Sequence, residues 1–358
     1  TFSSSPAFRS TVTITAGVSI AGKVLFKANN ARIPNCLKRT TSGSSPITAT
    51  IIVTPKYTNA GVTCTGNPIS FTITVNPTPT VAAVTNQVLC NGAATTAVAF
   101  TGATTGTVYN WTSSNTAIGL AASGTGNIPS FVTTNTGNTP ISSTITITPT
   151  YTNGGVSCSG APITFTITVN PIPTVNGINN QVICNGSTTT GVTFTGNVAG
   201  TVYNWSNTNT AIGLGASGVG DIASFVTTNT TNATISGTIT ATPIYTNAGL
   251  GCTGTPISFT IAVNPIPTVN AVANQTICVG GSTTVVTPTG CVPGTVYNWT
   301  CSNTAIGLAA SGTGNIASFT GLNSTSGTVT STIVVTPTYT SGGVTCTGTT
   351  QNFTIAVN

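Results

Sequence analysis

The stretch Ile163-Thr164-Phe165-Thr166-Ile167-Thr168-Val169 alternates large apolar side chains with threonine. Successive side chains of a β-strand point to opposite faces, so this stretch predicts a strand with one buried face and one polar face. Ile, Val and Thr also fit a pleated strand surface because their side chains are branched at Cβ. The alternation recurs at 69–75, and Ile145 and Ile147 stand between threonines. Signals for helices are absent, so we expect an all-β chain.

A spacing of 94 residues divides the chain into repeats. Landmark residues recur at this spacing, namely Tyr57, Tyr151, Tyr245 and Tyr339, Cys64, Cys158, Cys252 and Cys346, and Trp111, Trp205 and Trp299. Self-similarity at a fixed period is the signature of a tandem array of one module. We expect repeat 1 at 1–76, repeat 2 at 77–170, repeat 3 at 171–264 and repeat 4 at 265–358. Repeat 1 is 18 residues short, because it lacks the counterpart of 77–94, an opening strand with its cysteine.

Each repeat carries the signals of a β-sandwich. Turns are marked by Asn153-Gly154, Asn91-Gly92 and Asn185-Gly186, since Asn and Gly tolerate left-handed backbone angles. Roughly seven strands per repeat, with a tryptophan on a central strand, favour an immunoglobulin-like sandwich. Joints such as Val169-Asn170-Pro171-Ile172-Pro173 contain two prolines in three residues, which favours an extended spacer. We therefore expect tandem immunoglobulin-like β-sandwich domains arranged as a rod.

The composition argues against catalysis. The 358 residues include no His and a single acidic residue, Asp221. General acid–base catalysis needs a titratable side chain, usually His or a carboxylate, beside the reacting group. We expect no enzyme activity, no catalytic residue, no metal site and no cofactor. We also expect no membrane span, because no apolar run approaches the ~20 residues that cross a bilayer.

Six of the ten cysteines form pairs at equivalent positions of repeats 2 to 4. The members of each pair are 68 residues apart, and the pairs are Cys90 with Cys158, Cys184 with Cys252, and Cys278 with Cys346. An even number of cysteines in a secreted chain favours a disulfide framework. We expect a bond within each pair, from the opening strand to the turn before the last strand. Such a bond stabilises each sandwich by ~4 kcal/mol in the chain-entropy model.

Four cysteines remain. Cys291 and Cys301 occur in repeat 4 alone and flank the turn before Trp299, so we expect them to bond to each other. Cys36 and Cys64 lie in repeat 1, where the usual partner of Cys64 falls in the missing stretch. Cys64 is expected to bond either to Cys36 or to a preceding segment or another chain.

Several motifs recur in the same order in repeats 2 to 4. Gly-Thr-Val-Tyr-Asn-Trp occurs at 106–111, 200–205 and 294–299, and Thr-Pro-Thr-Tyr-Thr-Asn-Gly-Gly-Val-Ser-Cys occurs at 148–158. With the Val-Asn-Pro-Ile-Pro-Thr-Val joints, these motifs resemble the PKD-like repeats of very large surface proteins of Bacteroidota. The resemblance covers repeats 2 to 4 and repeat 1 from about Ile33. It implies an immunoglobulin-like fold, secretion by the type IX route, and an extracellular place at the cell surface in adhesins, stalks or gliding-associated fibres.

Trp111, Trp205 and Trp299 allow two interpretations. Exposed aromatic rings hold sugars in carbohydrate-binding modules, whereas many sandwiches bury a tryptophan on a central strand. The three residues occupy one scaffold position and have no acidic cluster beside them, which favours the core. Burial of Trp205 would support a passive stalk, and exposure would support a multivalent module that binds carbohydrate or another surface.

All seven basic residues lie in repeat 1, at Arg9, Lys23, Lys27, Arg32, Lys38, Arg39 and Lys56. They form either a docking face for an anionic partner or the more soluble face of a divergent end domain. Nucleic acid is not an expected partner, because no stacking aromatic residues are interleaved with them. Asp221 stands where repeats 2 and 4 have Asn127 and Asn315, and a lone carboxylate does not make a calcium site.

The leading hypothesis is a structural segment of an extracellular filament or adhesin stalk. Its expected partners are neighbouring repeats or further copies of the same protein, with surface glycans as a second class of partner. A sandwich without its first strand has an open edge, and open edges recruit strands from other chains. Repeat 1 therefore either receives a strand from a neighbouring subunit, which builds a homopolymer, or continues an upstream strand of a longer array.

Overall fold

The computed structural model describes residues 11–15 and 43–358. These ranges consist of β-strands, their connections and three 3-10 helices of a single turn each, which confirms the all-β prediction. Within them, no helix combines the length and the apolar character that a membrane crossing requires. The strands of these ranges form four sheets, which are divided between two compact units, 1–136 with 140–170 and 137–139 with 171–358.

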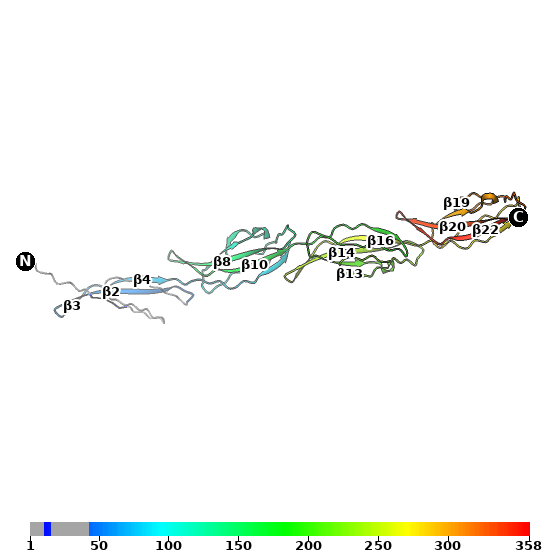
Figure 1. Ribbon diagram of the computed structural model, residues 1–358. Coiled ribbons are helices and arrows are strands. Elements are labelled where there is room, and N and C mark those ends of the chain that lie inside the picture. Colours follow the sequence, from blue (N-terminus) through cyan, green and yellow to red (C-terminus); the bar gives the residue numbers. More distant parts are fainter. Residues whose placement is uncertain (1–10, 16–42) are drawn as a thin grey trace, which may run out of the picture. The chain divides into compact units, whose positions relative to one another are not determined.

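Repeat 3 shows the arrangement that repeats 2 to 4 share (Figure 1). Its elements are β11 (Gln181–Cys184), β12 (Val202–Asn207), η2 (Thr210–Ile212), β13 (Ser217–Val219), β14 (Ile235–Asn247), β15 (Leu250–Thr253) and β16 (Ile257–Asn264). The strand order is β11-β16-β14-β12-β13, and β15 pairs with the C-terminal end of β14. β11 runs parallel to β16, whereas the other pairs are antiparallel.

Repeats 2 and 4 have the same order of strands. Repeat 2 contains β5 (Gln87–Cys90), β6 (Val108–Ser113), η1 (Thr116–Ile118), β7 (Ser123–Thr125), β8 (Ile141–Asn153), β9 (Val156–Ser159) and β10 (Ile163–Asn170). Repeat 4 contains β17 (Gln275–Ile277), β18 (Val296–Cys301), η3 (Thr304–Ile306), β19 (Ser311–Thr313), β20 (Val329–Ser341), β21 (Val344–Thr347) and β22 (Gln351–Val357). In both, the first strand pairs in parallel with the last strand.

The alternation predicted at 163–169 is confirmed in β10. Phe165, Ile167 and Val169 are 2%, 1% and 0% exposed, while the threonines between them are half-buried on the opposite face. β8 follows the same rule, with Ile145 and Ile147 fully buried. Full burial of one such side chain contributes about 1.5–3 kcal/mol, so these two strands supply a large share of the core.

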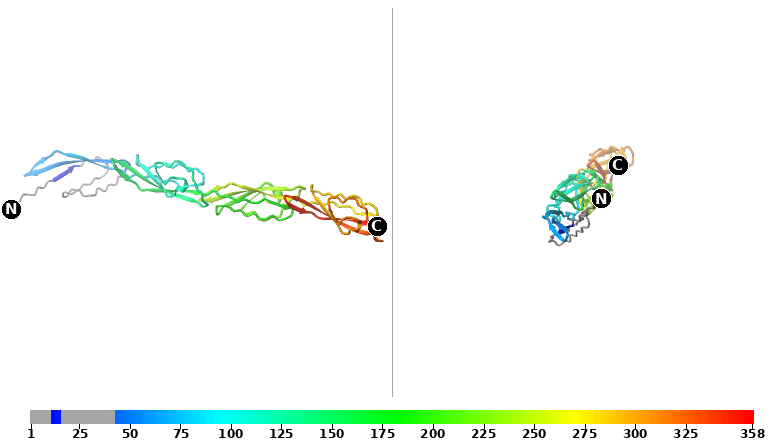
Figure 2. Two further views of the ribbon diagram at one scale, coloured as in Figure 1. Left: turned by 90° about the horizontal axis from the view of Figure 1, so that it is seen from above. Right: turned by 90° about the vertical axis from the view of Figure 1, so that its left-hand side faces the viewer.

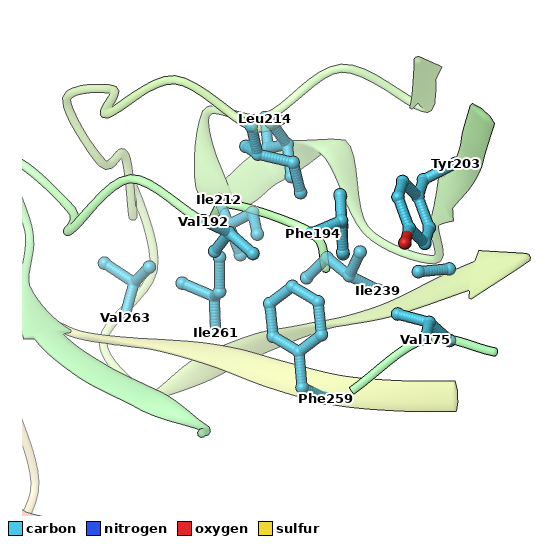
Figure 3. Close-up of a cluster of buried hydrophobic side chains, with 12 residues drawn as sticks. Val175, Val192, Phe194, Tyr203, Ile212, Leu214, Ile239, Phe259, Ile261 and Val263 are labelled. Atoms are coloured by element: carbon cyan, nitrogen blue, oxygen red, sulfur yellow. The ribbon is translucent and has the colours of Figure 1, made fainter. Parts of the chain in front are cut away.

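The core lies between the sheet and a second layer (Figure 3). In repeat 3, Phe259 of β16 and Ile239 of β14 belong to one buried cluster with Val192 and Phe194 of the second layer. This layer differs from the regular strands predicted for it. It consists of extended segments joined by isolated bridges, such as the one between Val192 and Ile222.

Side chains in the second layer take over hydrogen bonds that a strand ladder would make. The amide of Phe194 donates to Oδ1 of Asp221 at 2.9 Å. The hydroxyl of Thr227 donates to the carbonyl oxygens of Cys184 and Ser187 at 2.9 and 3.0 Å. Thr and Asp compete for backbone groups in this way, so the layer stays extended without continuous strand pairing.

The hairpin between β8 and β9 turns at Gly154 and Gly155, which have φ angles of 60° and 78°. Two consecutive positive φ angles match the twist of the strands in a two-residue hairpin. The turn predicted at Asn153-Gly154 is confirmed, as are the turns at Asn91-Gly92 and Asn185-Gly186.

Repeat 1 has a smaller sheet. Its strands are β1 (Thr11–Thr15), β2 (Ile47–Asn59), β3 (Val62–Thr65) and β4 (Ile69–Val75). The register follows the other repeats, since Ile14 lies opposite Val53 as Trp111 lies opposite Ile147. Among the described strands, β4 pairs with β2 alone, so its other edge lacks the parallel strand that β10, β16 and β22 have. In repeats 2 to 4 that edge is occupied by β5, β11 and β17.

Candidate functional site at the joint between repeats

A disulfide bond closes the joint between repeats 3 and 4. Cys184 at the end of β11 is bonded to Cys346 in β21, with a sequence separation of 162 and Cα atoms 5.6 Å apart. β21 lies against β11 where the two repeats meet (Figure 1 and Figure 2). The bond therefore connects two repeats rather than two strands of one sandwich.

The predicted bond between Cys184 and Cys252 is wrong, because these residues lie at opposite ends of one sheet. Cys184 stands beside Asn264 at the C-terminal end of β16. Cys252 stands beside Tyr245 at the C-terminal end of β14, which is antiparallel to β16, and it is disulfide-bonded too. A rise of about 3.3 Å per residue separates these ends by roughly 30 Å, whereas a disulfide needs Cα atoms within about 7 Å.

The other two predicted pairs are wrong for the same geometric reason. Cys278 is a free thiol, while its predicted partner Cys346 is bonded to Cys184. Cys158 is a free thiol, while its predicted partner Cys90 is disulfide-bonded. In repeats 2 and 4, as in repeat 3, the opening strand and the hairpin occupy opposite ends of the sheet.

The predicted bond between Cys291 and Cys301 is also wrong, since both are free thiols. Cys301 is buried at the end of β18, where its Sγ is hydrogen-bonded to Oγ of Ser331 at 3.0 Å. Cys291 is exposed, and its Sγ accepts a hydrogen bond from Oγ1 of Thr268 at 3.1 Å. One thiol thus belongs to the core and the other to the surface of repeat 4.

Two further predictions fall partly outside the described residues. Cys36 lies outside them, and Cys64, its expected partner, is an exposed free thiol. Six residues of the expected docking face also lie outside them, namely Arg9, Lys23, Lys27, Arg32, Lys38 and Arg39. The seventh, Lys56, lies on β2. The docking face stays a prediction.

A hairpin of repeat 4 docks onto repeat 3 beside the disulfide. Nδ2 of the fully buried Asn264 donates to the carbonyl oxygens of Ser341 and Val344 at 3.0 and 3.3 Å. These two residues flank the turn between β20 and β21. The turn packs on β11 so closely that a Cβ atom on Gly342 would lie 2.9 Å from the side chain of Val182. Hydrogen bonds, close packing and a covalent bond therefore hold this joint together.

The joint between repeats 1 and 2 has the same hydrogen bonds. Nδ2 of Asn76 donates to the carbonyl oxygens of Asn153 and Val156 at 3.0 and 3.3 Å. Cys158, the counterpart of Cys346, is nevertheless a half-buried free thiol. The cysteine equivalent to Cys184 would lie in an opening strand of repeat 1, and the described residues of repeat 1 include no such strand.

The joint asparagines were not among the predicted site residues. The sequence motif Val-Asn-Pro occurs at each joint, but the two prolines alone were expected to stiffen it. Asn76 and Asn264 instead bind the next repeat directly. The signal was the recurrence of the asparagine itself, which a spacer made rigid by prolines does not require.

The tryptophans belong to the core, as the scaffold interpretation predicted. Trp111 and Trp299 are each 7% exposed, and Trp205 is half-buried against the core of repeat 3. The Trp205 ring lies over the neighbouring strand, where a Cβ atom on Gly218 would come within 2.3 Å of it. The rings therefore do not form a flat exposed platform for a sugar.

Asp221 takes the structural role of Asn127. Its Oδ1 accepts a hydrogen bond from the amide of Phe194 at 2.9 Å, as Oδ1 of Asn127 does from the amide of Phe100. Burial raises the pKa of Tyr203 above its usual value, and the charge of the Asp221 carboxylate raises it further. The replacement of Asn by Asp thus keeps the hydrogen bond and adds a charge.

No protein-family model matches this chain, and no curated protein matches it. Among solved structures, the chain is similar to immunoglobulin domains 1–5 of Sidekick-1, at 12% identity and a TM-score of 0.31, over 98% of this chain and 74% of that one. It is similar to Drosophila N-cadherin EC1-4 at 11% identity and a TM-score of 0.29, over 87% and 83% of the two chains. It is similar to the human Desmocollin-1 ectodomain at 11% identity and a TM-score of 0.28, over 86% and 67%. Similarity at this level carries no functional argument, and the fold assignment rests on strand order and burial.

Proposed function

We propose that this chain is a structural segment of an extracellular bacterial filament or adhesin stalk whose neighbouring repeats are fastened to each other. The observation that carries the proposal is the bond between Cys184 and Cys346, because it crosses a joint. A disulfide inside a sandwich stabilises that sandwich alone, whereas a bond across a joint limits bending and separation of two sandwiches. Disulfides persist in oxidising surroundings, which supports a place outside the cell, at the cell surface.

The chemistry of the surface supports a passive role rather than catalysis. Only 2% of residues are charged, and repeats 2 to 4 contain no Lys or Arg. Proteases that cleave after basic residues therefore have no target in these repeats. The burial of the tryptophans does not favour the alternative function of a carbohydrate-binding module.

The PKD-like motifs extend the proposal to surface proteins of Bacteroidota that are secreted by the type IX route. Tyr203 and Trp205 of the Gly-Thr-Val-Tyr-Asn-Trp motif pack in or against the core of repeat 3. Asn264 of the Val-Asn-Pro motif binds the next repeat. These positions support an interpretation of the motifs as parts of a scaffold that is stacked many times.

The open edge of β4 supports growth by strand addition from another copy of the chain. Among the described strands, β4 pairs with β2 alone. In repeats 2 to 4 a parallel strand covers this edge. An added strand would complete the sandwich of repeat 1 and bring its own cysteine to the free thiol of Cys158.

Small-angle X-ray scattering of the purified chain, oxidised and reduced, tests the stalk. We expect end-to-end repeats to give a maximum dimension several times their cross-section, with a narrower spread of dimensions in the oxidised protein. Oxidised Cys346→Ser protein should show a broader spread of dimensions than the oxidised wild type, because its joint between repeats 3 and 4 has no covalent bond. A compact particle in both redox states contradicts the proposal.

A peptide with the sequence of 79–92 tests strand addition separately, because it contains the opening strand of repeat 2 with Cys90. The peptide is expected to protect β4 from hydrogen exchange and to form a disulfide with Cys158. The same peptide with Val88 and Leu89 replaced by serine is the control. Equal protection by both peptides, or by neither, contradicts strand addition.

A further inference from the structure

The joint between repeats 3 and 4 is made of two complementary halves. We name the first the receiving face, which in repeat 3 consists of Val182 and Cys184 of β11 with Asn264. We name the second the docking hairpin, which in repeat 4 consists of the turn 341–344 with Cys346. Repeat 4 carries a further receiving face and repeat 1 a further docking hairpin, and the cysteine of each is free.

The extra receiving face belongs to repeat 4. β17 pairs in parallel with β22, and the amide of Val279 donates to the carbonyl oxygen of Asn358 at 2.9 Å, as the equivalent amide does in repeat 3. Cys278 occupies the position of Cys184, and its thiol is exposed and free. Asn358 occupies the position of Asn264, and it is exposed rather than buried. The backbone of the receiving face is thus in place in repeat 4.

The extra docking hairpin belongs to repeat 1. Cys64 of β3 pairs with Tyr57 of β2 in the register that the hairpin of repeat 4 has. The turn at 60–61 has two positive φ angles, 41° and 81°, like the turn of the hairpin in repeat 4. Cys64 is exposed and free, and Val62 is 67% exposed. The hairpin therefore has the docked conformation without a repeat against it in the described part of the chain.

Cys184 and Cys346 show how these positions behave when both halves are present. Cys90 and Cys184 hold the receiving-face position of repeats 2 and 3, and both are disulfide-bonded. Cys252 and Cys346 hold the hairpin position of repeats 3 and 4, and both are disulfide-bonded. Within the described ranges, Cys278 and Cys64 have no complementary half beside them, and their thiols belong to the two halves that the joint between repeats 3 and 4 brings together.

We propose that the receiving face of repeat 4 binds the docking hairpin of repeat 1 of a second copy of this chain, with a disulfide between Cys278 and Cys64 of the two copies. This inference rests on the proposed structural function and deepens it by naming the partner and the bond. The contact is heterologous, because different surfaces of the two copies meet. A heterologous contact leaves one receiving face and one docking hairpin free at the ends of every dimer, so it propagates into a linear polymer.

Formation of the bond needs an oxidant, which we take to be a small-molecule disulfide such as oxidised glutathione. The thiolate of Cys278 attacks one sulfur of the oxidant, so a mixed disulfide forms and one glutathione thiolate leaves. The thiolate of Cys64 from the second copy then attacks the Cys278 sulfur and releases the second glutathione thiolate. Two protein thiols are oxidised to one disulfide, and one oxidised glutathione is reduced to two glutathione molecules.

The test is oxidation of the purified 358-residue chain in glutathione buffer, followed by non-reducing electrophoresis and mass spectrometry of chymotryptic peptides. We expect a ladder of multiples of the chain that collapses on reduction, and a peptide pair that contains Cys278 and Cys64. Cys278→Ser and Cys64→Ser proteins should each lose the ladder that this bond builds. An equimolar mixture of the two variants should give dimers and nothing longer, because each contributes one competent half.

Cys291→Ser is the matched control, since Cys291 is another exposed free thiol of repeat 4, and its ladder should equal that of the wild type. Unchanged thermal unfolding of each variant shows that the fold is intact. The inference is overturned by a monomeric wild type, by a bond between Cys278 and Cys64 of the same chain, or by a ladder that persists in Cys278→Ser.

Failure of this inference is distinguishable from failure of the proposed function. An extended particle in scattering without a ladder in electrophoresis would support the stalk and contradict the contact with a second copy. A ladder in electrophoresis together with compact particles in scattering would support the contact between copies and contradict the stalk. Bonds through Cys158 would indicate strand addition at repeat 1 instead of stacking on its hairpin.

Discussion

Cys184 and Cys346 are bonded to each other across the boundary of two repeats. Each lies in a short strand at the end of its own sheet, β11 in repeat 3 and β21 in repeat 4. The bond therefore adds nothing to the hydrogen bonds within either sheet. It acts on the joint, where it supports the hydrogen bonds of Asn264 to the docked hairpin.

Replacement of Cys346 by Ser is expected to loosen the joint without unfolding either sandwich. The loop that the bond closes spans 162 residues, so its loss lowers the free energy of unfolding of repeats 3 and 4 by up to about 5 kcal/mol in the chain-entropy model. Hydrogen exchange should rise in β11 and in the hairpin of β20 and β21, while the centres of β14 and β20 stay protected. Cys291→Ser, which removes a free surface thiol, should change neither measurement. Uniform loss of protection throughout repeat 4 would contradict a role confined to the joint.

Gly342→Ala is expected to weaken the same joint, and Gly154→Ala provides a matched comparison. The two glycines hold the same turn position, with φ angles of 57° and 60°, so the strain within the turn is equal. A Cβ atom at 342 lies 2.9 Å from Val182, whereas one at 154 has nothing within 4 Å. Overpacking should make Gly342→Ala more destabilising by about 1–3 kcal/mol. Chemical denaturation and the rate at which dithiothreitol reduces the joint disulfide measure the difference, and equal effects would argue against the contact.

Asp221→Asn is expected to lower the pKa of Tyr203 while leaving it above its usual value. Burial, the larger cause of the raised pKa, is unchanged, and only the contribution of the carboxylate is removed. Asn127 shows that an Asn Oδ1 can keep the hydrogen bond to the backbone amide. Ultraviolet titration of tyrosinate, after alkylation of the free thiols, measures the shift. An unchanged pKa of Tyr203 would mean that the Asp221 charge does not affect the ionisation of the Tyr203 phenol.

The same pKa shift predicts the direction of a pH effect on stability. The folded state holds the Tyr203 proton more tightly than the unfolded chain, whose tyrosines titrate near pH 10. The stabilisation is complete below about pH 10 and is lost as the pH rises toward the folded pKa, because the unfolded state then releases more protons. Wild-type protein should lose more stability above about pH 10 than Asp221→Asn, and thermal unfolding across this range tests the difference.

Gly218→Ala is expected to displace the Trp205 ring. The new Cβ atom would lie 2.3 Å from the ring, so the ring or the strand β13 must shift. We expect a loss of about 1–3 kcal/mol and a red shift of tryptophan fluorescence. Gly177→Ala, where nothing lies within 4 Å of the added Cβ, should stay within about 0.5 kcal/mol of wild type. Equal stabilities of the two variants would show that the ring is not held against the strand.

Local patterns were enough to predict the strands and turns. The alternation at 163–169 predicted β10, and Asn153-Gly154 predicted its preceding hairpin turn, because side-chain period and allowed φ angles act over a few neighbouring residues. The burial of Trp111 and Trp299 also followed from one recurring position on a central strand. The irregular second layer did not follow, since side-chain hydrogen bonds such as that of Asp221 replace ladder bonds only where two distant segments meet.

The partners of the cysteines depended on the tertiary structure. In a periodic chain, each hairpin cysteine has an opening-strand cysteine in its own repeat and another in the preceding repeat, and the shorter spacing of 68 residues favoured its own repeat. The order of amino acids placed Cys184 in an opening strand and Cys346 before a last strand. Stacking of the docked hairpin on β11 then brought their Cα atoms to 5.6 Å, while the length of the sheet kept Cys184 away from Cys252. A disulfide forms where two Cα atoms approach within reach, and that distance is a property of the packed repeats rather than of the intervening sequence.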